Sequence, residues 1–380
     1  MDDKTKFTHL GRPKPKLGTA VNPNITRAST LLFEKSEDLY RSDIRSYGRH
    51  GSEVHDALEE AFTTLENGAG TSLTPSGLSA CTLAILSQVK SGDHLLLTDS
   101  VYGPSRNFCL KYLSSMGVET EIYDPNIGAD IASLIRRNTS AIFLESPGSL
   151  TFEIQDVPAI TKIAKKSGVK TIIDNTWSAG LSYKPLEHGV DISVHAATKY
   201  VGGHSDIMFG AVISRTKTMA NSVALTRKYL GLATSPDDTY QILRGFRTLA
   251  TRFWTQEAAA LDLSQWLETC PQVIRCLNPA LASHPNNDLW KRDFSGSASL
   301  FGVVLKPSDK KQIDNFINSL NLFGIGFSYG GYESVVIHCD PQLRRKHKSQ
   351  LEGPLIRFGI GLENVDDLKS DIKQAFEHGF

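Results

Sequence analysis

The chain has 380 residues, 40% hydrophobic and 22% charged, and its 41 acidic residues balance its 41 basic ones. That length allows two domains with large cores, and the balanced charge favours neither nucleic acid nor an anionic membrane as a partner. No apolar run approaches the roughly 20 residues of a membrane span. The five scattered cysteines form no C-x-x-C pair, and the charged start MDDKTKFTHL is unlike a secretory signal. We therefore expect a soluble, cytoplasmic protein with reduced thiols.

Residues 1–50 show little periodicity and contain basic, proline-rich segments such as HLGRPKPKLG. They predict an extended arm, either disordered or lying across a partner subunit. A helix is predicted from Glu53, because the apolar residues of EVHDALEEAFTTL recur at steps of three and four on one stripe. Asn67 and Gly68 end this helix.

Short apolar runs then alternate with helical stretches such as VPAITKIAKKSG. The runs are 94–98, 141–145, 170–174, 192–194 and 209–213. They are too continuous for a half-exposed sheet, so an α/β fold is expected, with a mostly parallel sheet covered by helices. This larger domain would span residues 51–244. A long helix, short strands and a closing helix then predict a smaller C-terminal α/β domain over residues 245–380.

Three groups fall where strands end, which is where ligands collect in a parallel sheet. Asp174 closes the run TIIDNTW, Lys199 follows the run DISVH, and Gly77 lies in TPSGLSA, a turn that opens into an apolar stretch. A lysine and a carboxylate so placed match the needs of pyridoxal phosphate: the lysine forms a Schiff base, and the carboxylate keeps the pyridine nitrogen protonated. Separately, each has an ordinary reading, as a surface lysine, a helix-capping Asp and a plain turn.

The phosphate of such a cofactor needs donors, and a helix start supplies them. The backbone N–H groups of Gly77 and Leu78 form an anion site, and Thr198 adds a hydroxyl. In SYGRHGS, Arg49 can bind a phosphate through its forked guanidinium, with Tyr47 beside it. The alternatives are a plain N-cap turn and an ordinary basic turn.

Five motifs in order, YGRHG, TPSGLSA, IIDNTW, AATKYVGGHSD and SYGGYES, resemble the Cys/Met-metabolism family of pyridoxal phosphate enzymes. The similarity spans nearly the whole chain and implies the fold of type I pyridoxal phosphate enzymes. It implies a Schiff-base and catalytic role for Lys199, pairing of Asp174 with the pyridine nitrogen, and stacking of Tyr102, which also counts as catalytic. The phosphate ligands implied within one subunit are Gly77, Leu78 and Thr198. Tyr47 and Arg49 are implied to reach a neighbouring subunit's phosphate.

On the substrate side, the resemblance implies that Arg357 grips the α-carboxylate, with Ser328 and Tyr329 lining the same pocket. Tyr229 is a further candidate, where the similarity requires a gap. The implied substrate is a small thioether amino acid, and the implied assembly is a homo-oligomer, a tetramer built from dimers that share active sites. Metal binding is not expected, because His195 and His204 lack carboxylate or thiolate partners at familiar spacing.

The activity implied is β-elimination of L-cystathionine to homocysteine, pyruvate and ammonia, a carbon–sulfur lyase reaction of methionine biosynthesis. A γ-lyase or γ-synthase and a cysteine-S-conjugate β-lyase are the alternatives within the family. Ala196, where many members have serine, and YGRHG in place of YSRxxNPT favour β-chemistry. Tyr329 stands where tryptophan is expected, which leaves fine substrate preference open.

Two readings from other classes are weaker. A nucleotide-binding oxidoreductase would need a G-x-G-x-x-G after the first strand, which is missing, and would leave the Asp174–Lys199 pair unexplained. A non-enzymatic regulator that kept the fold is the other alternative, and no essential group of the expected site is missing from the sequence.

Overall fold

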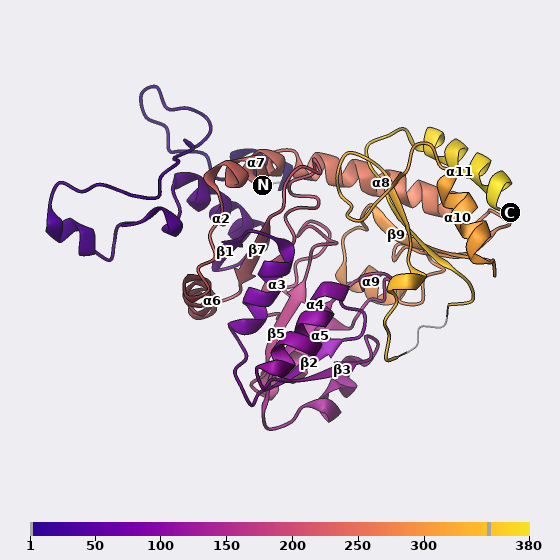
Figure 1. Ribbon diagram of the computed structural model, residues 1–380, viewed down its shortest axis with the longest axis horizontal. Helices are drawn as coiled ribbons and strands as arrows, with labels where there is room; N and C mark the ends of the chain where they lie inside the picture. The colour runs from indigo at the N-terminus through magenta and orange to yellow at the C-terminus, as the bar shows by residue number, and fades with distance from the viewer. Residues whose placement is uncertain (1–2, 348–350) are drawn as a thin grey trace.

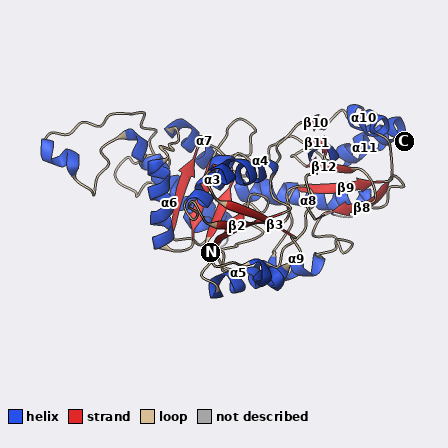
Figure 2. Cartoon of the chain, turned by 60° about the horizontal axis from the view of Figure 1, so that its bottom comes forward, coloured by secondary structure: helices blue, strands red, loops and turns tan. Residues whose placement is uncertain are grey.

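The computed structural model describes residues 3–347 and 351–380, so residues 1 and 2 of the expected arm lie outside it. Two sheets organise the chain, a seven-stranded and a five-stranded one, and α8 (Leu249–Leu267) runs from one towards the other (Figures 1 and 2). The predicted boundaries after residues 50 and 244 remain a prediction.

The large sheet has the strand order β1-β7-β6-β5-β4-β2-β3. Its strands are β1 (Gly70–Thr74), β2 (His94–Thr98), β3 (Glu119–Tyr123), β4 (Thr139–Glu145), β5 (Lys170–Asp174), β6 (Ile192–His195) and β7 (Gly210–Ser214). The strands from β3 to β6 are parallel, whereas β7 runs antiparallel to both of its neighbours. The predicted α/β class with a mostly parallel sheet is therefore confirmed.

Both faces of this sheet are buried. On β4, for example, Ala141 and Phe143 face one apolar cluster, while Ile142 and Leu144 face the other. This double burial explains the continuous apolar runs, because alternate side chains of a strand point to opposite faces. The helices that accompany the sheet are α2 (Glu53–Leu65), α3 (Gly77–Leu86), α4 (Gly103–Asn107), α5 (Val157–Lys166), α6 (Lys217–Tyr229), α7 (Pro236–Phe246) and α9 (Asn287–Asp293), with the π-helix η3 (Phe108–Leu113) and the 3-10 helix η4 (Gly128–Leu134).

The small sheet has the order β10-β11-β12-β9-β8 and its own apolar cluster. Its strands and helices are β8 (Val273–Leu277), β9 (Leu300–Leu305), β10 (Gly324–Ile325), β11 (Val335–His338), β12 (Leu355–Gly359), α10 (Lys310–Asn318), α11 (Val365–Gly379) and the turn η5 (Asp340–Gln342). The predicted closing helix is α11, and its apolar face is buried where it packs on α10, with Phe316 and Phe376 stacked at 4.7 Å.

The N-terminal segment begins with α1 (Asp3–His9), which no sequence pattern predicted. Phe7 is buried, and its ring meets Phe246 of α7 edge to face at 5.3 Å. The chain then extends from the body as an arm with the short turns η1 (Ser36–Tyr40) and η2 (Gly48–His50) (Figure 1). Large apolar side chains of this arm are exposed, Leu17 and Leu32 almost fully. Across the described ranges, no helix has both the length and the apolar character to cross a bilayer.

Candidate active site

Lys199 lies in the loop that leaves β6 and is half-buried. Its Nζ donates a hydrogen bond to the hydroxyl of Ser328 at 2.7 Å and lies 5.1 Å from the centre of the Tyr329 ring. Burial, reinforced by the positive charge of Arg357, lowers the Lys199 pKa to about 8, while Asp174 acts in the opposite direction. About a tenth of this amine is therefore neutral and nucleophilic at pH 7, and about half at pH 8, far more than for an ordinary lysine.

Asp174 ends β5, next to the strand that leads to Lys199, and its two oxygens have different partners. Oδ1 accepts hydrogen bonds from the Thr176 N–H at 3.0 Å and the Thr176 hydroxyl at 2.5 Å. Oδ2 faces the Cys81 thiol at 3.6 Å. The Thr176 hydroxyl also accepts the N–H of Ala196 at 2.8 Å. Thr176 thus fixes the carboxylate and joins it to the loop that carries the lysine.

The start of α3 is prepared for an anion. Ser76 and Ser79 form a capping box that satisfies their own N–H groups. The two amides between these serines, of Gly77 and Leu78, have no acceptor among the residues that the structure describes. Unpaired N–H groups at a helix N-terminus, together with the helix dipole, favour a phosphate.

Gly77 is also required by its closeness to the lysine loop. A Cβ on Gly77 would lie 2.4 Å from the Cβ of Ala196 and 2.9 Å from its Cα. These distances are far inside van der Waals contact, and the atoms belong to backbone or to a side chain that cannot rotate away. Gly77 therefore lets the helix start and the lysine loop form one surface.

Gly77→Ala is expected to lower the free energy of unfolding by roughly 1–3 kcal/mol, as overpacking does, and to weaken cofactor binding, because α3 must shift away from Ala196. Gly103→Ala is the matched control: Gly103 also begins a helix, and nothing lies within 4 Å of its added Cβ. Thermal unfolding and cofactor titration of both variants test this. Equal behaviour of the two would contradict the close approach.

Thr198 follows, two residues on, the Ala196 that packs against this helix start, but its hydroxyl already has partners. It accepts the N–H of Phe209 at 2.9 Å and donates to the Phe209 carbonyl at 3.2 Å. These bonds fix the turn between the lysine loop and β7. Its hydroxyl must turn from the Phe209 carbonyl to donate to a phosphate.

Tyr102 lies just before α4, with 43% of its surface exposed. Its N–H donates to Oε2 of Glu145 at 2.7 Å. Glu145 ends β4 directly beside Asp174 and is buried, and burial followed by the Asp174 charge raises its pKa well above the usual range. Burial also raises the Tyr102 pKa, so its hydroxyl keeps its proton at neutral pH.

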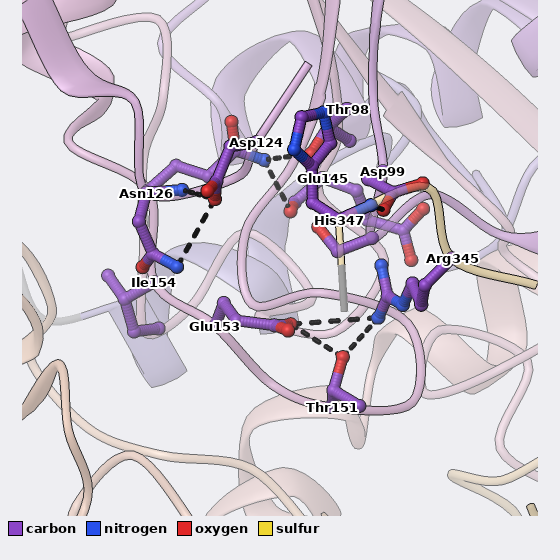
Figure 3. Close-up of polar contacts among 12 residues, drawn as sticks. Thr98, Asp99, Asp124, Asn126, Glu145, Thr151, Glu153, Ile154, Arg345 and His347 are labelled. Carbon is purple, nitrogen blue, oxygen red and sulfur yellow. Dashed lines mark hydrogen bonds and ion pairs between the residues drawn. The ribbon is translucent and has the colours of Figure 1, made fainter. Parts of the chain in front are cut away.

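The segment around Arg345 connects the C-terminal part of the chain to the loops that follow strands β2 and β4 of the large sheet (Figure 3). Asp99, after β2, is buried and accepts the backbone N–H groups of Lys346 at 3.0 Å and His347 at 2.6 Å, and the Arg106 guanidinium at 2.7 Å. Arg345 pairs with Glu153 at 3.7 Å. These contacts hold the loop that carries Tyr102.

The substrate-side residues come from strand β12 of the small sheet and from the loop between its strands β10 and β11. Arg357, on β12, is buried, and its Nη2 donates to the Ser328 carbonyl at 3.3 Å. Its guanidinium carbon lies 5.9 Å from the centre of the Tyr329 ring. Ser328 has a φ of 96°, a strained conformation for a residue with a side chain. One turn thus brings Ser328 and Tyr329 against both Lys199 and Arg357.

Tyr47, Arg49 and Tyr229 are not brought to Lys199 within this chain. Arg49 lies against α6, where it lines a cavity of about 190 Å³ with His50, Ala224, Arg227, Lys228 and Leu232. Its guanidinium carbon is 5.8 Å from the Tyr47 ring. Tyr229, at the end of α6, is 78% exposed. A role for them at an active site requires another subunit.

The remaining residues fit pyridoxal phosphate. The aldehyde needs a lysine of lowered pKa, and the ring nitrogen needs a carboxylate, here one with an oxygen held by Thr176. The phosphate needs donors such as the two amides without an acceptor among the described residues, and the ring face needs an aromatic side chain such as the half-exposed tyrosine. Sequence reasoning missed Thr176, Cys81 and Glu145. Glu145 could have been found because it ends the apolar run 141–145, as Asp174 ends the run 170–174. Thr176 could have been found because it follows Asp174 by two residues.

Comparison with known proteins agrees with this geometry. The sequence model of the family described as Cys/Met metabolism PLP-dependent enzyme matches residues 4–377. Cystathionine beta-lyase of Haemophilus influenzae is 41% identical, over 99% of this chain and 98% of its own, and that of Escherichia coli is 39% identical, over 98% and 97%. The solved cystathionine gamma-lyase of Lactobacillus plantarum superposes with a TM-score of 0.93 at 27% identity, covering 100% of this chain and 99% of that one. The chain therefore belongs to the Cys/Met metabolism family of pyridoxal phosphate-dependent enzymes.

Proposed function

We propose that this enzyme eliminates the β-sulfur substituent of L-cystathionine, which yields homocysteine, pyruvate and ammonia. The observation that carries the proposal is a lysine of lowered pKa whose ionisation both Asp174 and the buried guanidinium of Arg357 influence. The curated relatives at about 40% identity are named for this β-lyase activity. The γ-lyase resemblance is at 27% identity, which supports the β-reaction over the γ-reaction.

Pyridoxal phosphate, when bound, supplies an electron sink for the charge that forms when the Cα proton leaves. Lys199 would hold its aldehyde carbon, and Oδ2 of Asp174 its ring nitrogen. The amides of Gly77 and Leu78 would hold its phosphate. Tyr102, kept in place through Glu145, would cover the ring face.

Lys199 is the proposed base at Cα. Once displaced by the substrate amine it is a neutral amine, and its pKa of about 8 lies close to the working pH, where proton transfer is most effective. The ammonium formed at Nζ then carries the proton to the departing sulfur. Tyr102, whose raised pKa keeps its hydroxyl protonated, is the second donor within this site.

Arg357 is proposed to bind the substrate α-carboxylate through its two parallel N–H groups. Because it is buried, its charge is poorly screened, and this strengthens its hold on an anion. Tyr329 borders both Lys199 and Arg357, so its ring shapes the space between the reacting carbon and the carboxylate.

A homo-oligomer in the cytoplasm is also part of the proposal, and the expected form is a tetramer built from two dimers that share active sites. Tyr47 and Arg49 would reach the phosphate site of a neighbouring subunit, and the exposed apolar side chains of the arm would be covered there. The five cysteines are free thiols, as suits a reducing compartment.

A product assay on purified, cofactor-loaded protein with L-cystathionine tests the reaction. Pyruvate with homocysteine is the expected pair. Ketobutyrate with cysteine would transfer the enzyme to the γ-lyases and show that Ala196 and YGRHG are poor guides to reaction type. Neither pair from a cofactor-loaded protein would leave the fold and cofactor in place and reject the substrate.

A further inference from the structure

The thiol of Cys81 has no part in the mechanism above, yet it faces the carboxylate on which that mechanism depends. Cys81 lies in α3 and is 2% exposed, with its Sγ 3.6 Å from Oδ2 of Asp174. Burial, and then the Asp174 charge, raises the pKa of this thiol well above its usual range. The thiol is therefore protonated, and it donates its S–H to the carboxylate. The other charged or titratable groups that act on it are Glu145 and Tyr102.

The two carboxylate oxygens of Asp174 are treated differently by the protein. Oδ1 carries two strong donors from Thr176, the N–H and the hydroxyl. Oδ2 carries only the thiol among the described residues, and a thiol is a weak donor. Oδ2 therefore keeps most of its negative charge and remains the oxygen able to pair with a cofactor ring nitrogen.

We propose that Cys81 is a positioning residue that acts through Asp174: its weak S–H donor orients Oδ2 without withdrawing the charge that keeps the ring nitrogen protonated. This inference rests on the proposed pairing of Asp174 with the cofactor. A stronger donor at position 81 would stabilise the carboxylate by itself, make it less basic, and so weaken its hold on the ring proton.

The test is a comparison of Cys81→Ser with Cys81→Ala. The serine hydroxyl competes for Oδ2, so C81S is expected to lower kcat by about tenfold with KM changed less than about twofold, the size of one charge-assisted hydrogen bond. C81A removes the donor that orients Oδ2 and is expected to lower kcat by about threefold, a smaller loss than in C81S. A packing role alone predicts the reverse order, because serine preserves the volume that alanine loses.

Two readouts do not depend on turnover. The dissociation constant of pyridoxal phosphate from apoprotein is expected to rise in C81S and not in C81A. The ¹⁵N resonance of ring-labelled cofactor is expected to move towards its unprotonated position in C81S alone. Cys109→Ser is the matched control, since Cys109 is equally buried in the same apolar cluster and does not contact Asp174.

Asp174→Asn separates the two proposals. If D174N leaves the ¹⁵N resonance and cofactor affinity unchanged, the pairing itself is wrong. If D174N changes both while C81S and C81A match the wild type, the role of Cys81 is rejected. If C81S does not fold, C81A decides alone: the proposal requires a ring nitrogen at least as protonated as in the wild type, and a less protonated one overturns it.

Discussion

Lys199→Ala is expected to lower turnover of L-cystathionine by at least about 10³-fold, because it removes both the group that binds the cofactor aldehyde and a general base, which alone contributes about 10²–10⁴-fold. The amine cannot be replaced from nearby, since the neighbouring basic group, Arg357, stays protonated at any working pH. Pyruvate release measures the effect. Borohydride reduction followed by mass spectrometry is expected to trap cofactor on the wild type and not on K199A.

Two further variants show what the loss means. Lys199→Arg keeps the positive charge but has no neutral amine at working pH, so it is expected to be as inactive as K199A. Lys165→Ala, on the exposed side of α5, removes a lysine that has no part in the site and is expected to leave turnover unchanged. Turnover of K199A within tenfold of the wild type would reject Lys199 as the catalytic amine.

The parts of the fold that local patterns determine were predictable from the sequence. The run 170–174 is apolar because both of its faces are buried, and its last residue, Asp174, lies where a strand leaves the sheet. The same reasoning places Lys199 after β6 and Gly77 at the start of α3. A short list of strand-end residues therefore included the central residues of the candidate site.

Strand direction was not predictable in this way. β7 has the same continuous apolar character as its parallel neighbours, yet it runs antiparallel between β6 and β1. An apolar run indicates that a strand is buried on two faces, but it does not indicate the direction of the strand. Parallel and antiparallel strands that are buried on both faces present the same side chains to the core.

Contacts between distant residues were equally hidden. Lys199 and Ser328 lie 129 positions apart, and the hydrogen bond between them depends on how the two sheets pack. His195, which has no carboxylate partner at a familiar spacing in the sequence, is a second case. The structure places its ring 5.9 Å from that of Phe62 and bonds its Nε2 to the buried Glu66, again 129 positions away. Such partners follow from tertiary packing, which no local pattern specifies.

Arg357→Gln is expected to raise KM for L-cystathionine by about 30-fold or more, because loss of a buried, charge-assisted contact costs about 2–5 kcal/mol. The substitution of this buried side chain has two consequences. It removes the contact with the substrate carboxylate, and it removes a positive charge that lowers the Lys199 pKa. The Lys199 pKa in the apoprotein is thus expected to rise above about 8, so that the amine becomes neutral only at higher pH. Steady-state kinetics and the pH dependence of cofactor attachment to apoprotein measure the two effects separately.

Arg357→Lys distinguishes the shape of the guanidinium from its charge. Lysine keeps a positive charge near Lys199 but cannot form two parallel hydrogen bonds, so R357K is expected to show a raised KM with the midpoint of cofactor attachment still near pH 8. Arg344→Gln, an exposed arginine, is the control and is expected to change neither quantity. If R357Q left KM unchanged, Arg357 would bind no carboxylate. If the attachment midpoint of R357Q stayed at that of the wild type, Arg357 would lie too far from Lys199 to act on it. Because charge and hydrogen-bond geometry change independently in this series, Arg357 can be assigned to substrate binding, to the ionisation of Lys199, or to both.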